Sequence, residues 1–248
     1  MENMHQFNSL AFITQGGPVS ITVALVLLAM SLASWYLIFV KSYQAMTLRH
    51  SVSRYMESFW QSPSLDAALN AKVGNPVSRL ATQAVEAAEH HQQHASKRLA
   101  DACSHDEFVA RAMRRVISRE TAQLESGLSV LASVGSVAPF VGLFGTVWGI
   151  YHALASISVS GQATLDKVSG PVGEALIMTA FGLAVAIPAV LAYNALVRSN
   201  RNLVGQLENF AHDLHILLTT GAPLAGGSAV QEMAPSKSAA AHLKEVPA

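Results

Sequence analysis

The chain has 248 residues and a formal net charge of zero, and 51% of its residues are hydrophobic while only 13% are charged. Its mean hydropathy of +0.32 is too high for an ordinary soluble domain, so we expect a membrane protein. The balanced charge gives no indication of a nucleic-acid partner. The single cysteine, Cys103, excludes an intrachain disulfide framework, and we expect it to be an unreactive thiol in a reducing cytoplasm.

Three apolar stretches without Lys or Arg are long enough to cross a bilayer as helices, which takes about 20 residues each. The first is predicted at residues 19–40 and is closed by Lys41. The second is predicted at residues 127–157, beginning in an extension outside the membrane. The third is predicted at residues 171–197 and is closed by Arg198. The first stretch has no basic leader and no small-residue cleavage site, so we expect it to remain in the mature protein.

The distribution of Lys and Arg predicts the orientation of these helices. The N-terminal segment, residues 1–18, has neither residue, whereas residues 41–126 contain eleven. The connection at residues 158–170 contains only Lys167. By the positive-inside rule, residues 41–126 and the C-terminus face the cytoplasm, and the N-terminus and the short connection face the periplasm. We therefore predict an all-α integral membrane protein with three transmembrane helices and long helical extensions into the cytoplasm.

The predicted cytoplasmic domain, residues 41–126, is rich in helix-forming residues. Residues 101–125 contain no Pro or Gly, so we expect this helix to run into the second span without a break. After the third span we predict a helical extension at residues 198–220. The remaining residues, 221–248, are rich in Ala, Gly, Pro and Ser and are predicted to be a disordered tail.

Small residues recur at helical spacing in the second and third spans. In lipid there is no hydrophobic drive between helices, so close backbone contact through small residues becomes the means of packing. We therefore predict that these positions pack the two spans against each other or against neighbouring copies. The alternative is that they only reflect the high Gly and Ala content of membrane helices. The positions are Ala138, Gly142, Gly145 and Gly149 in the second span, and Ala175, Thr179, Gly182, Ala186 and Ala189 in the third.

Glu174 is the only acidic residue in the three predicted spans. A carboxylate in hydrocarbon costs at least a few kcal/mol, and such residues usually face a bundle interior or a water-filled path. This favours a site that binds and releases protons. The alternative is an acid in the first helical turn after Pro171, stabilised by the helix dipole at the outer rim of the membrane. The residues alone leave both interpretations open.

Thr146 and Thr179 are the other polar side chains of interest in these spans. On an ideal helix Thr179 lies about 140° around the axis from Glu174, so the two share a broad arc but no narrow stripe. Together with Thr146 they are candidates for a pore lining. In the alternative interpretation, each threonine bonds only to the backbone of its own helix, as is common in membrane helices.

Other functional classes are less well supported by the sequence. The segment EHHQQH places His90 and His94 four residues apart, as a helical metal-binding pair requires. It lacks a third strong ligand, so a solvated polar helix face is favoured over a metal-binding transporter or sensor, and we expect no metal and no other cofactor. A passive scaffold would leave Glu174 unexplained. We find no nucleophile elbow and no phosphate-binding loop, so we do not expect an enzyme.

The segments SVAPFVGLFGTVWGIYHAL, residues 136–154, and GPVGEALIMTAFGLAVAIPAVLAYN, residues 170–194, resemble the signature of the MotA/TolQ/ExbB proton-channel family. The resemblance is closest to the ExbB branch. It covers the second and third spans, and the three-span topology agrees over most of the chain. It implies a bacterial inner-membrane homopentamer around a pair of single-span ExbD subunits. In such an assembly proton flow is transmitted to TonB, which opens outer-membrane receptors for iron–siderophores and vitamin B12.

The resemblance assigns the pore glutamate to Glu174 and the pore-lining threonines to Thr146 and Thr179, and so favours the pore for Glu174. Gly173 stands where the family usually has alanine, which weakens the local helix propensity but leaves the glutamate in place. The TolQ branch has the same architecture and polar residues. It acts with TolR and TolA in outer-membrane constriction at division, and the spans do not separate the two branches.

Overall fold

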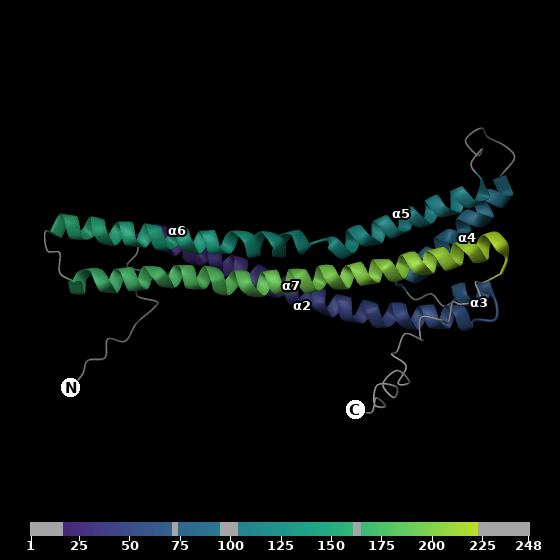
Figure 1. The fold of residues 1–248 in the computed structure, drawn as a ribbon, viewed down its shortest axis with the longest axis horizontal. Coiled ribbons are helices and arrows are strands. Elements are labelled where there is room, and N and C mark those ends of the chain that lie inside the picture. The colour runs from purple at the N-terminus through teal and green to yellow at the C-terminus, as the bar shows by residue number, and fades with distance from the viewer. Residues whose placement is uncertain (1–16, 71–73, 95–103, 161–164, 223–248) are drawn as a thin grey trace, which may run out of the picture. The chain divides into compact units, whose positions relative to one another are not determined.

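The computed structural model describes residues 17–70, 74–94, 104–160 and 165–222, and within these ranges every regular element is an α-helix (Figure 1). The helices are α2 (Gly17–Gln61), α3 (Leu65–Asn70), α4 (Pro76–His94), α5 (His105–Glu125), α6 (Leu128–Ser160) and α7 (Leu165–Thr220). Three stretches of the described helices are long and apolar enough to cross a membrane: Pro18–Gln61, His105–Ala155 and Ala175–Thr220. The predicted all-α membrane protein with three spans is thus confirmed. Cys103 and nearly all of the predicted tail lie outside the described residues.

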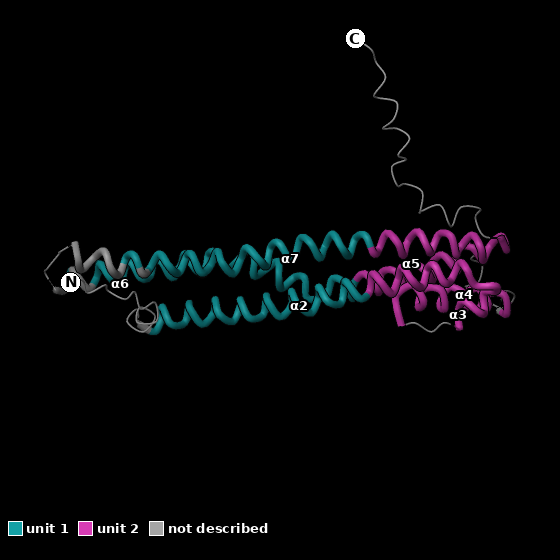
Figure 2. Tube along the Cα trace, turned by 90° about the horizontal axis from the view of Figure 1, so that it is seen from below, with its two compact units in different colours: residues 1–47, 122–202 teal, residues 48–121, 203–248 magenta. Residues whose placement is uncertain are grey.

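The helices form two units, which Figure 2 distinguishes by colour. Unit 1 comprises Met1–Thr47 and Ala122–Asn202, and unit 2 comprises Leu48–Thr121 and Leu203–Ala248. The long helices α2 and α7 contribute residues to both units, whereas α6 belongs to unit 1, and α3 and α4 belong to unit 2. Each unit has its own set of buried apolar side chains.

The core of unit 1 forms where α2, α6 and α7 pack together. Its buried side chains are Val23 and Leu27 from α2, Leu128, Leu131, Val134 and Ala138 from α6, and Ala175, Met178, Ala186, Ala189 and Leu196 from α7. The outer faces of the same helices leave large apolar side chains exposed, including Leu28, Phe140 and Leu191. Such an arrangement is typical of helices whose outer faces contact lipid or other subunits.

A turn at Ser126 and Gly127 separates α5 from α6, so the prediction of an unbroken helix was wrong. Gly127 has a φ of +81°, a left-handed conformation that glycine adopts without a Cβ clash and that commonly ends a helix. From α2, Lys41 Nζ donates to Ser126 Oγ at 3.3 Å. From α7, Asn200 Nδ2 donates to the Leu124 carbonyl at 3.0 Å and so provides a partner for one of the last carbonyls of α5.

In unit 2, Asn75 caps the N-terminus of α4 and also hydrogen-bonds to α2. Asn75 Oδ1 accepts the backbone N–H of Ser78 at 2.8 Å, and Pro76 occupies the first helical position, where its missing N–H costs nothing. Asn75 Nδ2 donates to both the carbonyl and the hydroxyl of Ser51 on α2, at 3.2 Å each. The side chain is buried, and these hydrogen bonds explain why a polar residue is tolerated there.

Aromatic side chains fill part of the core of unit 2. Phe210 of α7 is fully buried, and its ring lies 5.0 Å from that of Phe59 in an edge-to-face arrangement and 5.9 Å from that of Trp60. Tyr55, one turn before Phe59, donates its hydroxyl to the Ala68 carbonyl at 3.4 Å. Burial raises the pKa of Tyr55, so it remains a neutral donor.

An ion pair joins α4 to α5 within unit 2. Arg79 Nε and Nη2 donate to the two carboxylate oxygens of Glu120 at 2.8 and 2.5 Å, and Nη1 donates to the Gly74 carbonyl at 2.8 Å. The side chain of Glu120 is 5% exposed and that of Arg79 is 42% exposed. The hydrogen bond to Glu120 is the main reason that the pKa of Arg79 is raised, which keeps the guanidinium charged.

Replacing Arg79 with methionine is expected to destabilise unit 2 by about 2 kcal/mol, because Glu120 would keep a buried carboxylate without its bidentate donor. The cost is lower than for a fully buried pair because Arg79 is partly in water. Thermal unfolding followed by circular dichroism measures the change. Arg115→Met, at an exposed position of α5, is the matched control. Equal loss in both variants would show that the pair contributes nothing specific.

Candidate functional site

The small residues of the second and third spans lie where α6 and α7 meet, a contact that we call the α6–α7 seam. A Cβ on Gly142 would lie 2.6 Å from the Met178 carbonyl oxygen, and a Cβ on Gly182 would lie 2.7 Å from the Ala138 carbonyl oxygen. Side chains do not tolerate backbone atoms at such distances, so only glycine fits these two positions without separating the helices. The seam residues are all buried: Ala138, Gly142, Gly145, Gly149, Ala175, Gly182, Ala186 and Ala189.

Two threonines meet across the α6–α7 seam. Thr146 of α6 is 5% exposed, and its Oγ1 lies 2.5 Å from the Oγ1 of Thr179 of α7. Thr146 Oγ1 also lies 3.2 Å from the carbonyl oxygens of Gly142 and Ala175. A hydroxyl has one proton to donate. Both threonines are satisfied when Thr179 donates to Thr146 and Thr146 donates to one of the carbonyls.

Glu174 belongs to α7 and directly precedes Ala175, whose carbonyl lies within hydrogen-bonding distance of Thr146. The peptide backbone beside Glu174 is therefore held by the threonine pair. The side chain of Glu174 lies outside the part of the chain that the structure describes, so its place on a pore remains a prediction. At Gly173, a Cβ would meet nothing within 4 Å, so an alanine would fit there.

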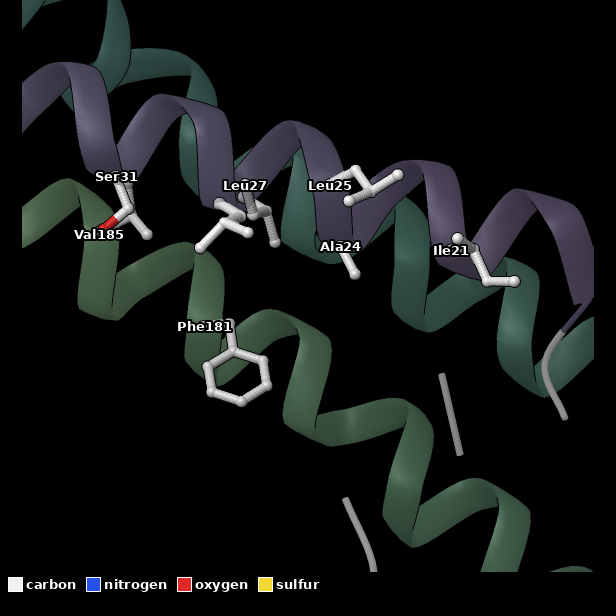
Figure 3. Close-up of a pocket in the computed structure, with 8 residues that line it drawn as sticks. Ile21, Ala24, Leu25, Leu27, Ser31, Phe181 and Val185 are labelled. Carbon is white, nitrogen blue, oxygen red and sulfur yellow. The ribbon is translucent and has the colours of Figure 1, made fainter. Parts of the chain in front are cut away.

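A separate apolar groove of 340 Å³ lies between α2 and α7 in unit 1 (Figure 3). Phe181 and Val185 line it from α7. None of its lining residues titrates, and Ser31 provides the one polar side chain among them. The lining of the groove suits apolar groups and offers no acid or base for proton transfer. From α2 it is lined by Ile21, Ala24, Leu25, Leu27, Leu28 and Ser31.

The histidines considered as a metal pair lie at the end of α4. The ring of His90 stacks on Phe108 of α5 with 6.2 Å between centroids, and the side chain of His94 lies outside the described residues. Among the residues that the structure describes, no three His, Cys, Asp or Glu side chains are placed to hold a metal together. The structure therefore does not test a pair formed by His90 and His94.

Sequence reasoning selected Thr146 and Thr179 separately and missed their direct contact. The contact could have been predicted from the number of residues between each threonine and a nearby glycine. Thr146 follows Gly142 by four residues and Thr179 precedes Gly182 by three, so each threonine shares a helix face with its glycine. Because the two glycines contact each other at the seam, with Cα of one 3.1 Å from a Cβ built on the other, the threonines meet one turn away.

Comparison with known proteins shows the family to which the chain belongs. Residues 74–209 match the MotA/TolQ/ExbB proton channel family. Biopolymer transport protein ExbB of Xanthomonas campestris pv. campestris is 45% identical over 209 residues, covering 82% of this chain and 83% of that protein. Biopolymer transport protein ExbB of Neisseria meningitidis is 41% identical over 208 residues, covering 82% of this chain and 93% of that protein.

A second kind of relative is similar over nearly the same length. Tol-Pal system protein TolQ of Pseudomonas aeruginosa is 37% identical over 199 residues, covering 79% of this chain and 86% of that protein. Both kinds of relative match about four-fifths of the chain. The chain therefore belongs to the MotA/TolQ/ExbB proton channel family and is a multi-pass protein of the bacterial inner membrane.

Proposed function

We propose that this chain is the proton-channel subunit of a motor of the TonB–ExbB–ExbD type, which couples the proton motive force to uptake of iron–siderophores and vitamin B12. The observation that carries this proposal is the similarity over 82% of the chain to relatives named ExbB, at 45% and 41% identity, compared with 37% for a relative named TolQ that matches a similar length. The hydrogen-bonded pair of Thr146 and Thr179 in the α6–α7 seam supports it, because a proton path through apolar helices needs polar groups.

In the proposed mechanism Glu174 binds and releases the proton. Thr146 fixes the turn of α7 that carries Glu174, through its hydrogen bond to the carbonyl of Ala175. Either threonine of the pair can donate to the other, as a hydroxyl relay requires. Because Thr146 has one proton, it gives up its hydrogen bond to the Ala175 carbonyl whenever it donates to Thr179. Each proton that crosses 100 mV releases about 2.3 kcal/mol, so a small number of protons suffices for a mechanical step.

The proposed assembly is a homopentamer of this chain around single-span ExbD subunits, with TonB as the output partner. ExbD supplies the aspartate that completes the proton path. The exposed apolar side chains of unit 1 would then contact lipid and neighbouring copies. The membrane crossings are residues 19–40, 127–157 and 171–197. Eleven Lys and Arg residues in residues 41–126 support a cytoplasmic location for that part, with the N-terminus in the periplasm.

Deleting the gene in its own host tests the proposal against the Tol–Pal alternative. The deletion strain is expected to lose growth on iron–siderophore complexes while its resistance to detergent stays normal, and a plasmid copy is expected to restore growth. Detergent sensitivity with normal siderophore-dependent growth would instead assign the chain to the Tol–Pal system, which maintains the outer membrane at division. The 37% identity to a TolQ protein makes this the alternative to test.

A further inference from the structure

Two histidines from different helices meet in unit 2. His91 lies near the end of α4 and His105 is the first residue of α5, and their ring centroids are 5.2 Å apart with the planes at 59°. Phe108 of α5 lies beside them, with its centroid 5.4 Å from that of His91. It follows His105 by three residues, which is about one helical turn. The imidazole pair therefore has an apolar ring against it.

The distance between the two imidazoles suits a shared metal ion. In a tetrahedral site each coordinating nitrogen lies about 2.1 Å from the metal, and adding about 1.1 Å from nitrogen to ring centre puts two centroids about 5.2 Å apart. The rings of His91 and His105 have this separation. Imidazole nitrogen is a preferred ligand for Zn²⁺, Ni²⁺ and Cu²⁺. The separation of the two rings is therefore compatible with both imidazoles binding one ion.

The hydrogen bonding of His105 also favours a metal ion at this histidine pair. His105 Nδ1 is buried and has no hydrogen-bond partner within the described residues, which is an unfavourable state that a metal bond would relieve. The neighbouring acids are engaged elsewhere. Asp106 Oδ1 lies 3.0 Å from His215 Nε2 of α7, and Glu107 pairs with Arg111. The hydrogen-bonding capacity of His105 Nδ1 is thus left unused within the described residues.

We propose that His91 and His105 form a two-histidine site for a borderline divalent transition-metal ion such as Zn²⁺, Ni²⁺ or Cu²⁺. No third His, Cys, Asp or Glu of the described residues is placed to complete the site, so water would fill the remaining coordination positions and the ion would exchange readily. An ion bound there links the end of α4 to the start of α5. The site differs from the pair expected from spacing alone, because its second ligand comes from another helix.

Copper and zinc titrations of the full chain in lipid nanodiscs test the site. We expect one ion per chain, and an electron paramagnetic resonance spectrum of bound Cu²⁺ with hyperfine splitting from two imidazole nitrogens. His91→Gln and His105→Gln are each expected to weaken Zn²⁺ affinity by at least about tenfold. His50→Gln, at an exposed position of α2 in unit 2, is the matched control and is expected to leave affinity unchanged.

A spectrum with one imidazole nitrogen or none would overturn the proposal, as would full Zn²⁺ affinity in His105→Gln. Equal weak binding in all three variants would identify adventitious metal only. Thermal unfolding of each metal-free variant shows whether a lost affinity reflects lost structure. The spectrum of the unaltered chain needs no variant, so a variant that fails to fold leaves the test intact. Because none of these measurements involves transport, the result is independent of the proposed function.

Discussion

Replacing Glu174 with glutamine is expected to abolish siderophore-dependent growth while the oligomer still assembles. Glutamine has nearly the same size and shape as glutamate but cannot bind and release a proton at neutral pH. Glu174 is also the only acid in the predicted spans, so no neighbouring carboxylate on this chain can replace it. We expect the uptake rate to fall by about 100-fold or more, as when a proton-transfer group is removed. Uptake of labelled siderophore in cells that carry only the variant measures the effect.

Glu125→Gln is the matched control for this experiment, because Glu125 is exposed and lies at the end of α5, outside the predicted spans. It is expected to support normal uptake. Native mass spectrometry of both variants shows whether the oligomer is intact. Normal uptake by Glu174→Gln with an intact oligomer would place Glu174 on the membrane rim and would remove it from the proton path.

Replacing Gly142 with alanine is expected to separate α6 from α7 and to lower the stability of unit 1 by about 1–3 kcal/mol, the usual cost of overpacking. The added methyl group would lie 2.6 Å from the Met178 carbonyl oxygen and 3.2 Å from the Thr179 Cα. Backbone atoms cannot turn aside as a flexible side chain can. The 2.5 Å contact between Thr146 and Thr179 would therefore be lost as well, and transport with it.

Gly205→Ala in α7 is the control, because a Cβ there meets nothing within 4 Å. Alanine favours helix over glycine by about 1 kcal/mol, so this variant is expected to be as stable as the unaltered protein or more so. The two variants are compared by thermal unfolding in the same detergent and by siderophore uptake. If Gly142→Ala matched Gly205→Ala in both assays, the close approach at the seam would not be needed.

Much of the fold could be predicted because membrane helices are selected by simple rules of length and apolarity. The stretches closed by Lys41 and Arg198 both lie in long apolar helices of the structure. The break between α5 and α6 was missed although its signal was present. Gly127 lies two residues beyond Glu125, the last residue of α5, and a glycine just after a helix commonly ends it in the left-handed conformation.

Contacts between distant residues could not be predicted from one sequence, because they depend on how one helix is positioned along another. Arg79 and Glu120 are 41 residues apart, and nothing in their local sequence pairs them. The contact of Thr146 with Thr179 depends in the same way on the register of the α6–α7 seam. The sequence identified Thr146 and Thr179 as candidate site residues, but only the structure shows that they contact each other.

The turn at Gly127 also determines how deeply α6 can enter the bilayer. The last carbonyls of α5 and the first N–H groups of α6 have no partner within a continuous helix. Those that no side chain hydrogen-bonds must instead bond to water or to lipid headgroups. Moving one such backbone group into the hydrocarbon without a hydrogen-bond partner would cost several kcal/mol. The 33 residues of α6 extend about 50 Å, which exceeds the hydrocarbon thickness of about 30 Å.

Neither α2 nor α7 is interrupted beside this turn, where Lys41 and Asn200 lie within continuous helices. The backbone hydrogen bonds of α2 and α7 are complete at this level of the helix, wherever it lies in the membrane. Only their side chains therefore oppose a movement of these helices along the membrane normal. α6 differs because the hydration of its own backbone resists such a shift. The backbone of α6 therefore sets its own depth in the membrane. The close contacts of the α6–α7 seam and the hydrogen bond from Lys41 to Ser126 hold α7 and α2 to that depth.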